Sequence, residues 1–232
     1  AEGNPVSNLS ISGIEGVRVP YDNGNPVFPQ ADEDNIVIEW DEQELVRDTD
    51  YKLSYENNTE AGTATVVIKG RGNYTGEVRV NYTIVYNIND VTVEMLDETG
   101  NVVTGNKLQY TGEVIQPTVR LKYKNTVLIA GTDYDIAYNN TNSMNVGDGY
   151  TVSITGKGLY TGTRSDSYSI VPRELSTVSK LTIESVQYDG QKHQFYPKYK
   201  LGDYILQNNK DFKVLSWTNA ADDTDHGCIK AG

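Results

Sequence analysis

The sequence predicts an all-β protein of tandem antiparallel β-sandwiches, the third of them incomplete. Its 232 residues include 17 Tyr and 21 Gly but only 3 Phe, a composition that favours half-buried strands joined by tight turns. Apolar residues alternate with polar ones, and no segment shows the three-and-four spacing of a helix. One heptapeptide occurs twice, at Gly70–Gly76 (GRGNYTG) and Gly156–Gly162 (GKGLYTG), and its 86-residue offset recurs from Tyr82 to Tyr168.

The first copy, residues 1–87, opens with the alternation Leu9-Ser10-Ile11 and reaches a turn at Asp22-Asn23-Gly24. Asn-Gly steps supply the positive φ that tight hairpins need. Strands are then expected at 36–40, 51–56, 65–68 and 78–86. In the second of these, Tyr51, Leu53 and Tyr55 share one face, which is the period of a half-buried strand. The heptapeptide lies between the last two strands, so we expect it to be their hairpin.

The second copy, residues 88–173, repeats this order. Pro117 precedes an alternating strand from Val119 to Tyr123, and Asp133-Tyr134 matches Asp50-Tyr51 at an offset of 83. The offset then reaches 86, so three residues are inserted within 139–147, where a surface loop tolerates them.

The third copy, residues 174–232, begins its strands at Leu181-Thr182-Ile183 and has Asp211-Phe212 where the others have Asp-Tyr. It reaches Ala231-Gly232, which match Ala61-Gly62, without the last two strands or the heptapeptide. An incomplete sandwich exposes unpaired strand edges. We therefore expect the missing strands to come from residues beyond this sequence or from a neighbouring molecule.

Charge and composition exclude several kinds of partner. The net charge of −12 opposes binding to nucleic acid and to anionic membrane surfaces. No apolar run approaches the ~20 residues that cross a bilayer. The N-terminus has no signal-peptide pattern, so the chain is either intracellular or a piece without its targeting segments. Cys228 cannot form an internal disulfide, and with His193 and His226 it makes no metal site; a lone cysteine fits both the reduced cytosol and bacterial surface proteins.

A longer pattern in the second copy resembles a known family. It runs from Tyr110-Thr111-Gly112 through Pro117 and Gly131–Asn140 (GTDYDIAYNN) to the heptapeptide and Ile170. With about seven strands in about 80 residues, it is similar to the tandem immunoglobulin-like (Ig-like) repeats of Gram-positive bacterial surface proteins. The first copy departs from the pattern at 47–50 (RDTD). The resemblance covers nearly the whole chain and implies an extracellular, cell-surface or secreted segment, monomeric within a longer chain.

Two repeated features could hold ligands, and each has a structural alternative that we favour. Gly156, Gly158 and Gly162 are spaced like a phosphate-binding loop, but a strand follows them and not the helix that such loops need. Asp50, Asp133 and Asp211 supply one carboxylate per copy. Calcium takes six to eight oxygen ligands, so we expect these aspartates to accept backbone N–H bonds in turns.

The remaining candidates are acidic, aromatic and basic side chains. The acidic stretches 32–34 and 41–44 are expected to be solvated, with calcium bound at a junction by Asp90, Asp97 or Glu98 as the alternative. Tyr123 and Tyr204 could stack on sugar rings, although most tyrosines of such a sandwich are half-buried. Sites for an internal Lys–Asn amide are disfavoured because Lys52, Lys69 and Lys157 fall at outward or turn positions.

We find no pattern of nucleophile, base or paired carboxylates, so no catalytic, cofactor or metal residues are predicted and the ligand-binding residues are unassigned. The sequence favours a non-enzymatic cell-surface stalk or adhesion segment that contacts protein or glycan partners. The alternative is an accessory carbohydrate-binding segment of a larger secreted glycan-degrading enzyme. An enzyme in its own right is the least favoured class.

Overall fold

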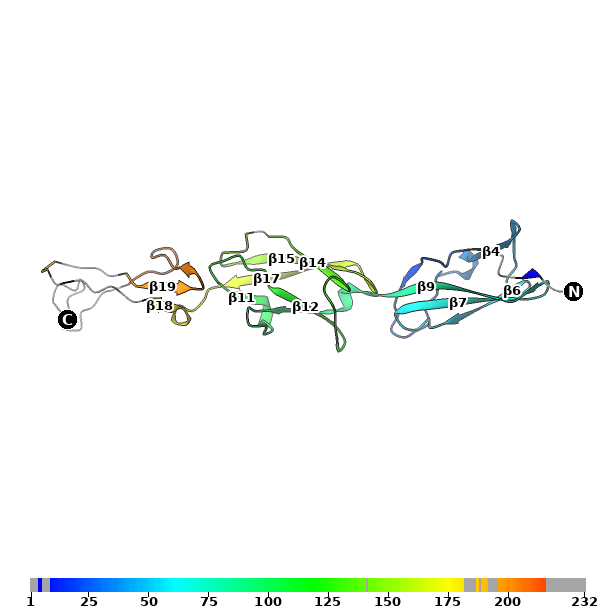
Figure 1. The fold of residues 1–232 in the computed structure, drawn as a ribbon, viewed down its shortest axis with the longest axis horizontal. Helices are drawn as coiled ribbons and strands as arrows, with labels where there is room; N and C mark the ends of the chain where they lie inside the picture. Colours follow the sequence, from blue (N-terminus) through cyan, green and yellow to red (C-terminus); the bar gives the residue numbers. More distant parts are fainter. Residues whose placement is uncertain are drawn as a thin grey trace. The chain divides into compact units, whose positions relative to one another are not determined.

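The computed structural model describes residues 4–5, 9–140, 142–181, 187, 189–191 and 196–215. This part of the chain is all-β, as predicted: it contains no helix of seven or more residues and consists of short strands joined by turns (Figure 1). In the described ranges, four 3₁₀ turns connect strands, namely η2 (Glu33–Asn35), η3 (Ile88–Asp90), η4 (Thr104–Asn106) and η5 (Leu175–Thr177).

Two sheets of the first copy enclose one core. The larger contains β6 (Tyr51–Glu56), β7 (Gly62–Gly70) and β9 (Glu77–Asn87), with β3 (Arg18–Pro20) added beside β9. The smaller contains β2 (Ser10–Ser12), β4 (Val37–Trp40) and β5 (Gln43–Glu44). Inward residues of both sheets, such as Ile38, Val66 and Ile84, belong to one buried cluster. Burying such side chains contributes roughly 1.5–3 kcal/mol each before entropy is subtracted.

The heptapeptide connects β7 and β9 as the expected hairpin. These strands pair antiparallel from Gly62↔Ile84 to Lys69↔Glu77, and Gly70 N donates to Gly76 O over 3.0 Å. From Glu77 to Ile84, alternate residues of β9 turn inward: Val78 and Val80 are half-buried, and Tyr82 and Ile84 are buried at 2% and 0% exposure. Val85 is buried as well, so the alternation ends there. The predicted period of two is therefore confirmed in this strand as far as Ile84.

The second copy also has two sheets. One has the order β10 (Thr92–Leu96), β12 (Thr118–Tyr123), β13 (Thr126–Val127). The other has the order β11 (Lys107–Gln109), β17 (Thr163–Val171), β15 (Gly147–Gly156), β14 (Tyr134–Tyr138). The alternation that starts at Tyr134 would place Ile136 on the inward face, but Ile136 is 36% exposed, because β14 is the edge strand and only its first residue reaches the core.

The sheets are mixed, which corrects the expectation of purely antiparallel sheets. β3 pairs with β9, and β11 with β17, in parallel. Two further short strands, β8 (Tyr74–Thr75) and β16 (Tyr160–Thr161), also pair in parallel with β1 (Asn4–Pro5) and β9 respectively. Parallel partners cannot be joined by a tight turn. Their direction is set by where a distant segment arrives, which alternation of side chains does not encode.

In the described part of the third copy, β18 (Ser179–Leu181), β19 (Lys198–Leu201) and β20 (Tyr204–Ile205) form an antiparallel sheet. His193, His226, Cys228 and the expected break after Gly232 lie outside the described residues. By internal contacts the chain divides into two compact units: unit 1 comprises 1–94, 119–137 and 152–166, and unit 2 comprises 95–118, 138–151 and 167–232.

Candidate functional site

The repeated aspartates are turn residues, as predicted. Each carboxylate accepts the backbone N–H of the residue four positions earlier: Asp50 from Val46 at 2.9 Å, Asp133 from Ile129 at 2.7 Å and Asp211 from Gln207 at 2.7 Å. A carboxylate that accepts such a bond holds the loop closed on itself. The one acid per copy therefore has a structural partner.

The heptapeptide docks on this turn. Arg71 N donates to Asp50 O and Lys157 N to Asp133 O, both over 2.8 Å. The basic side chains at this heptapeptide position add a second bond, from Arg71 Nη1 to Asp48 O and from Lys157 Nζ to Gly131 O. This capping role of the second heptapeptide residue was missed from the sequence, although the Arg/Lys pair at one repeat position was its signal.

The glycine at the third position of the heptapeptide is required by its backbone conformation and by a close contact. Gly158 has a φ of 58°, and a Cβ placed on it would lie 3.2 Å from Thr132 O; Gly72 has a φ of 63° and would approach Thr49 O to 3.1 Å. Glycine adopts this φ without steric cost. The segments that follow are strands β9 and β17, so no helix N-terminus completes a phosphate site.

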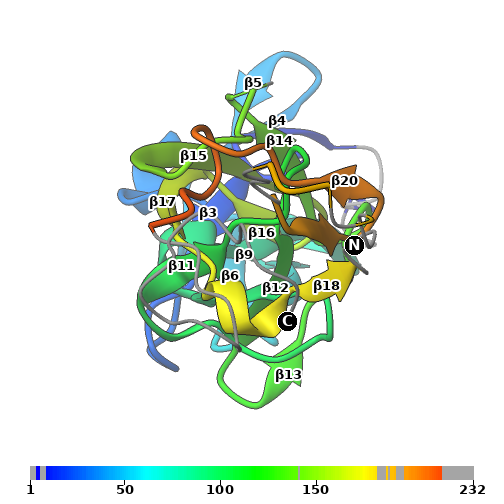
Figure 2. The ribbon, with the colours of Figure 1, turned by 90° about the vertical axis from the view of Figure 1, so that its left-hand side faces the viewer.

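Within unit 1, the second heptapeptide joins the last strand of the first copy. Strands β16 and β9, both labelled in Figure 2, pair in parallel, with Tyr160 opposite Tyr86 and Thr161 opposite Asn87. Tyr86 N donates to Leu159 O over 2.8 Å, and Arg18 Nη2 donates to Gly158 O over 2.6 Å. We call this pairing, with the rings packed on it, the tyrosine joint.

Four rings form the tyrosine joint. Tyr86 lies with its ring centroid 4.2 Å from Tyr123, 5.5 Å from Tyr160 and 5.0 Å from Tyr21. Lys124 Nζ lies 5.3 Å from the Tyr123 centroid and 5.8 Å from that of Tyr21, distances at which a cation is attracted to a ring. Burial raises the pKa of Tyr86, Tyr123 and Tyr160, so the cluster favours neutral hydroxyls.

The sequence-predicted sugar platforms are engaged elsewhere. Tyr123 packs on Tyr86 in the joint, and Tyr204 donates its hydroxyl to Asp211 Oδ2 over 2.8 Å. A Cβ on Gly112 would meet the Tyr204 ring at 2.8 Å, so this ring lies directly on the Tyr110-Thr111-Gly112 turn. Both rings are half-buried, as expected for tyrosines of such a fold.

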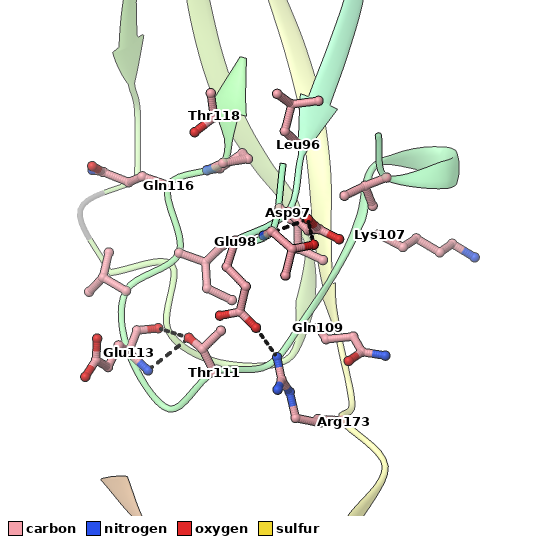
Figure 3. A pocket seen from close by; sticks show the side chains of 16 residues that line it. Leu96, Asp97, Glu98, Lys107, Gln109, Thr111, Glu113, Gln116, Thr118 and Arg173 are labelled. Atoms are coloured by element: carbon pink, nitrogen blue, oxygen red, sulfur yellow. Dashed lines mark hydrogen bonds and ion pairs between the residues drawn. The ribbon is translucent and has the colours of Figure 1, made fainter. Parts of the chain in front are cut away.

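Unit 2 contains a pocket of about 550 Å³ between the loop after β10 and strand β11 (Figure 3). Glu98 Oε1 accepts from Arg173 Nη2 over 3.2 Å, and Thr111 Oγ1 accepts from Glu113 N over 3.3 Å. The Arg173 side chain is only 16% exposed, and its Nε is buried without a hydrogen-bond partner among the described residues. Such a buried donor costs about 1–3 kcal/mol.

The charged lining residues of the pocket are Asp97, Glu98, Lys107, Glu113 and Arg173. Its described lining residues include no His, Cys or Ser. The Asp97 carboxylate accepts from Thr99 Oγ1, Thr99 N and Asn101 N at 2.7–2.9 Å. The hydrogen bond from the Thr99 hydroxyl, followed by the backbone bonds, lowers the pKa of Asp97. The carboxylate is therefore ionised and held within its own loop.

The other predicted candidates are distributed over the surface. Asp32 caps η2 through Asp34 N, and Glu33 accepts from Arg47 Nη1 and from the Tyr55 hydroxyl. Lys52, Lys69 and Lys157 are exposed. Over the ranges that the structure describes, no group of three or more His, Cys, Asp or Glu side chains is placed to hold a metal ion. Asp97 and Glu98 line the pocket, and Asp90 ends η3 in unit 1.

No protein-family model matches the chain, and no curated protein matches it. None of the helical turns in the described ranges is long and apolar enough to span a membrane.

Proposed function

We propose that this chain is a non-enzymatic segment of a cell-surface or secreted protein, built of tandem Ig-like β-sandwiches that serve as a stalk or adhesion arm. The Ig-like assignment is supported by the core that the two sheets of the first copy share and by the resemblance of the repeat pattern. The extracellular location is supported by that resemblance alone.

The tyrosine joint is the observation that carries the proposal. A backbone pair and four packed rings link the first copy to the heptapeptide of the second. Aromatic pairs contribute roughly 0.5–1.5 kcal/mol each beyond the area they bury. Such a joint resists separation of successive copies under load, which is what a stalk requires and what an isolated binding or catalytic domain does not need.

Calorimetry of the full chain tests the coupling. We expect the first two copies to unfold in one transition, and Tyr86→Ala to split that transition in two. Tyr74→Ala is the matched control, because Tyr74 occupies the same heptapeptide position as Tyr160 but packs on Trp40. An unchanged trace for Tyr86→Ala, with unchanged amide exchange at Tyr86, would mean that the joint transmits nothing and would remove this support.

The alternative remains an accessory carbohydrate-binding segment of a larger secreted enzyme. A glycan array separates the two, since a pure stalk shows no saturable binding. Saturable binding of one glycan, lost in Tyr123→Ala or Tyr204→Ala, would favour the alternative. A hydrolytic activity of the purified chain that one side-chain change abolishes would contradict both.

A further inference from the structure

The first copy contains a second aromatic pair with the geometry of the tyrosine joint. Trp40 and Tyr74 lie with ring centroids 6.4 Å apart at an interplanar angle of 67°. In the joint, Tyr123 and Tyr160 lie 6.4 Å apart at 70°. The residues correspond by position as well: Trp40 and Tyr123 each end a strand before a two-residue hairpin turn, and Tyr74 and Tyr160 are the fifth residue of each heptapeptide.

The strand that approaches each pair also has the same register. In the joint, Tyr86 lies opposite Tyr160, and its ring packs against both Tyr123 and Tyr160. In the first copy, Asn4 lies opposite Tyr74, and Pro5 opposite Thr75. Asn4 therefore occupies the strand position that corresponds to Tyr86, the residue whose ring packs between Tyr123 and Tyr160 in the joint. Tyr74 is half-buried, whereas Tyr160 is buried, which is the difference expected when the third ring is missing.

The turn beside the Trp40–Tyr74 pair is acidic, whereas the turn beside the Tyr123–Tyr160 pair is basic. The turn after Tyr123 begins with Lys124, which lies over the tyrosine rings. The turn after Trp40 is Asp41-Glu42. Asp41 and Lys124 share a left-handed backbone, with φ of 49° and 52°, so they occupy equivalent positions. Asp41 and Glu42 are exposed and free to face a cation on a partner.

We propose that Trp40, Tyr74, Asp41 and Glu42 form an interaction surface for a partner polypeptide that presents an aromatic side chain next to a lysine or arginine. The aromatic ring takes the place that Tyr86 has in the joint, and the cation faces the acidic turn. Charge complementarity favours a basic partner, since the chain carries a net charge of −12. The surface would bind such a segment whether or not the chain is a stalk.

NMR titration of the full chain tests the surface directly. The two tryptophans, Trp40 and Trp217, are distinguished by a Trp217→Phe variant, and the Trp40 indole signal is followed. The probes are the capped pentapeptides Gly-Val-Tyr-Lys-Gly, Gly-Val-Tyr-Glu-Gly and Gly-Val-Ala-Lys-Gly. We expect a saturable shift with the Tyr-Lys peptide, binding roughly two- to fivefold weaker with Tyr-Glu, and no shift with Ala-Lys.

Two variants make the outcome decisive without removing core residues. Asp41→Lys should reverse the preference, so that the Tyr-Glu peptide binds better than the Tyr-Lys peptide. Asn4→Tyr should supply the missing ring from the chain itself, raise the melting temperature and abolish peptide binding, whereas Asn4→Ala should do neither. No saturable shift with any peptide, or a preference that ignores Asp41→Lys, would overturn the proposal. A shift of Trp40 with an oligosaccharide alone would instead assign the pair to glycan binding.

Discussion

Removing one hydroxyl from each of two buried tyrosines should have unequal effects on stability. Tyr82 and Tyr168 are each 2% exposed and occupy equivalent places in β9 and β17, the last strands of the first and second copies. The Tyr82 hydroxyl donates to Val27 O over 2.6 Å, and the Tyr168 hydroxyl donates to Ile115 O over 2.9 Å. The Ile115 carbonyl also accepts from Ser143 Oγ over 2.7 Å. Replacement by Phe keeps the ring packing and removes only the bond.

The expected loss of unfolding free energy depends on which hydrogen-bond donors each carbonyl retains in the variant. In Tyr168→Phe the Ile115 carbonyl retains the Ser143 hydroxyl, so the cost should be that of one ordinary hydrogen bond, roughly 0.5–1.5 kcal/mol. In Tyr82→Phe the Val27 carbonyl loses its 2.6 Å bond, and a carbonyl deprived of its donor costs roughly 1–3 kcal/mol. Urea unfolding followed by circular dichroism, with unfolding free energies from linear extrapolation, measures both.

A double-mutant cycle sharpens this comparison. Ser143→Ala should raise the cost of Tyr168→Phe, because the Ile115 carbonyl then loses both donors, and it should leave the cost of Tyr82→Phe unchanged. Equal costs for the two Tyr→Phe variants, or strict additivity of Ser143→Ala with Tyr168→Phe, would refute the assignment of these bonds as the source of the difference.

Three further predictions concern pH, the repeated turn and the heptapeptide glycine. Burial raises the pKa of Tyr82 from 10 to about 12, so the folded state favours the neutral phenol. The stability associated with this shift is about 3 kcal/mol. It is present below pH 10 and is lost as the pH rises through 12. Tyr82→Phe should flatten this alkaline decline in unfolding titrations between pH 9 and 12, and an identical slope in the variant would contradict it. Asp133→Ala should lower the free energy of unfolding by about 1 kcal/mol, because it removes the acceptor for Ile129 N. Asp133→Asn keeps an oxygen acceptor and should lower it less. Equal stability losses of the two variants in thermal melts would show that the bond is not the cause. Gly158→Ala should destabilise more than Gly149→Ala, because both have positive φ but only Gly158 would place a Cβ against a backbone oxygen, Thr132 O at 3.2 Å; the same melting temperature for both would argue against that contact.

Local features of this fold could be predicted from the sequence because each depends on neighbours along the chain. The alternation from Tyr51 to Tyr55 gives a strand with one face inward, and the role of Asp50, Asp133 and Asp211 follows from a carboxylate's reach to a backbone N–H four residues away. The hairpin at the heptapeptide is equally local.

The candidate site could be predicted only in part. Tyr123 is a candidate from the sequence as a ring that could stack on sugars, but its partner Tyr86 lies at the end of another copy's last strand. Nothing in the spacing between the two residues indicates contact. The pocket that brings Arg173 to Glu98 depends likewise on residues 75 positions apart. Ile136 alternates correctly in sequence yet is exposed, because its strand lies at the sheet edge.

The sequence by itself thus determined the all-β class, the positions of the turns and the inward face of most strands, since side-chain period and turn chemistry act over a few residues. Only the tertiary structure decided which strands pair in parallel, how four tyrosines meet in the joint, and that Trp40 and Tyr74 repeat the arrangement of Tyr123 and Tyr160. These features depend on the direction from which distant segments arrive, and the pattern within each segment is compatible with several directions.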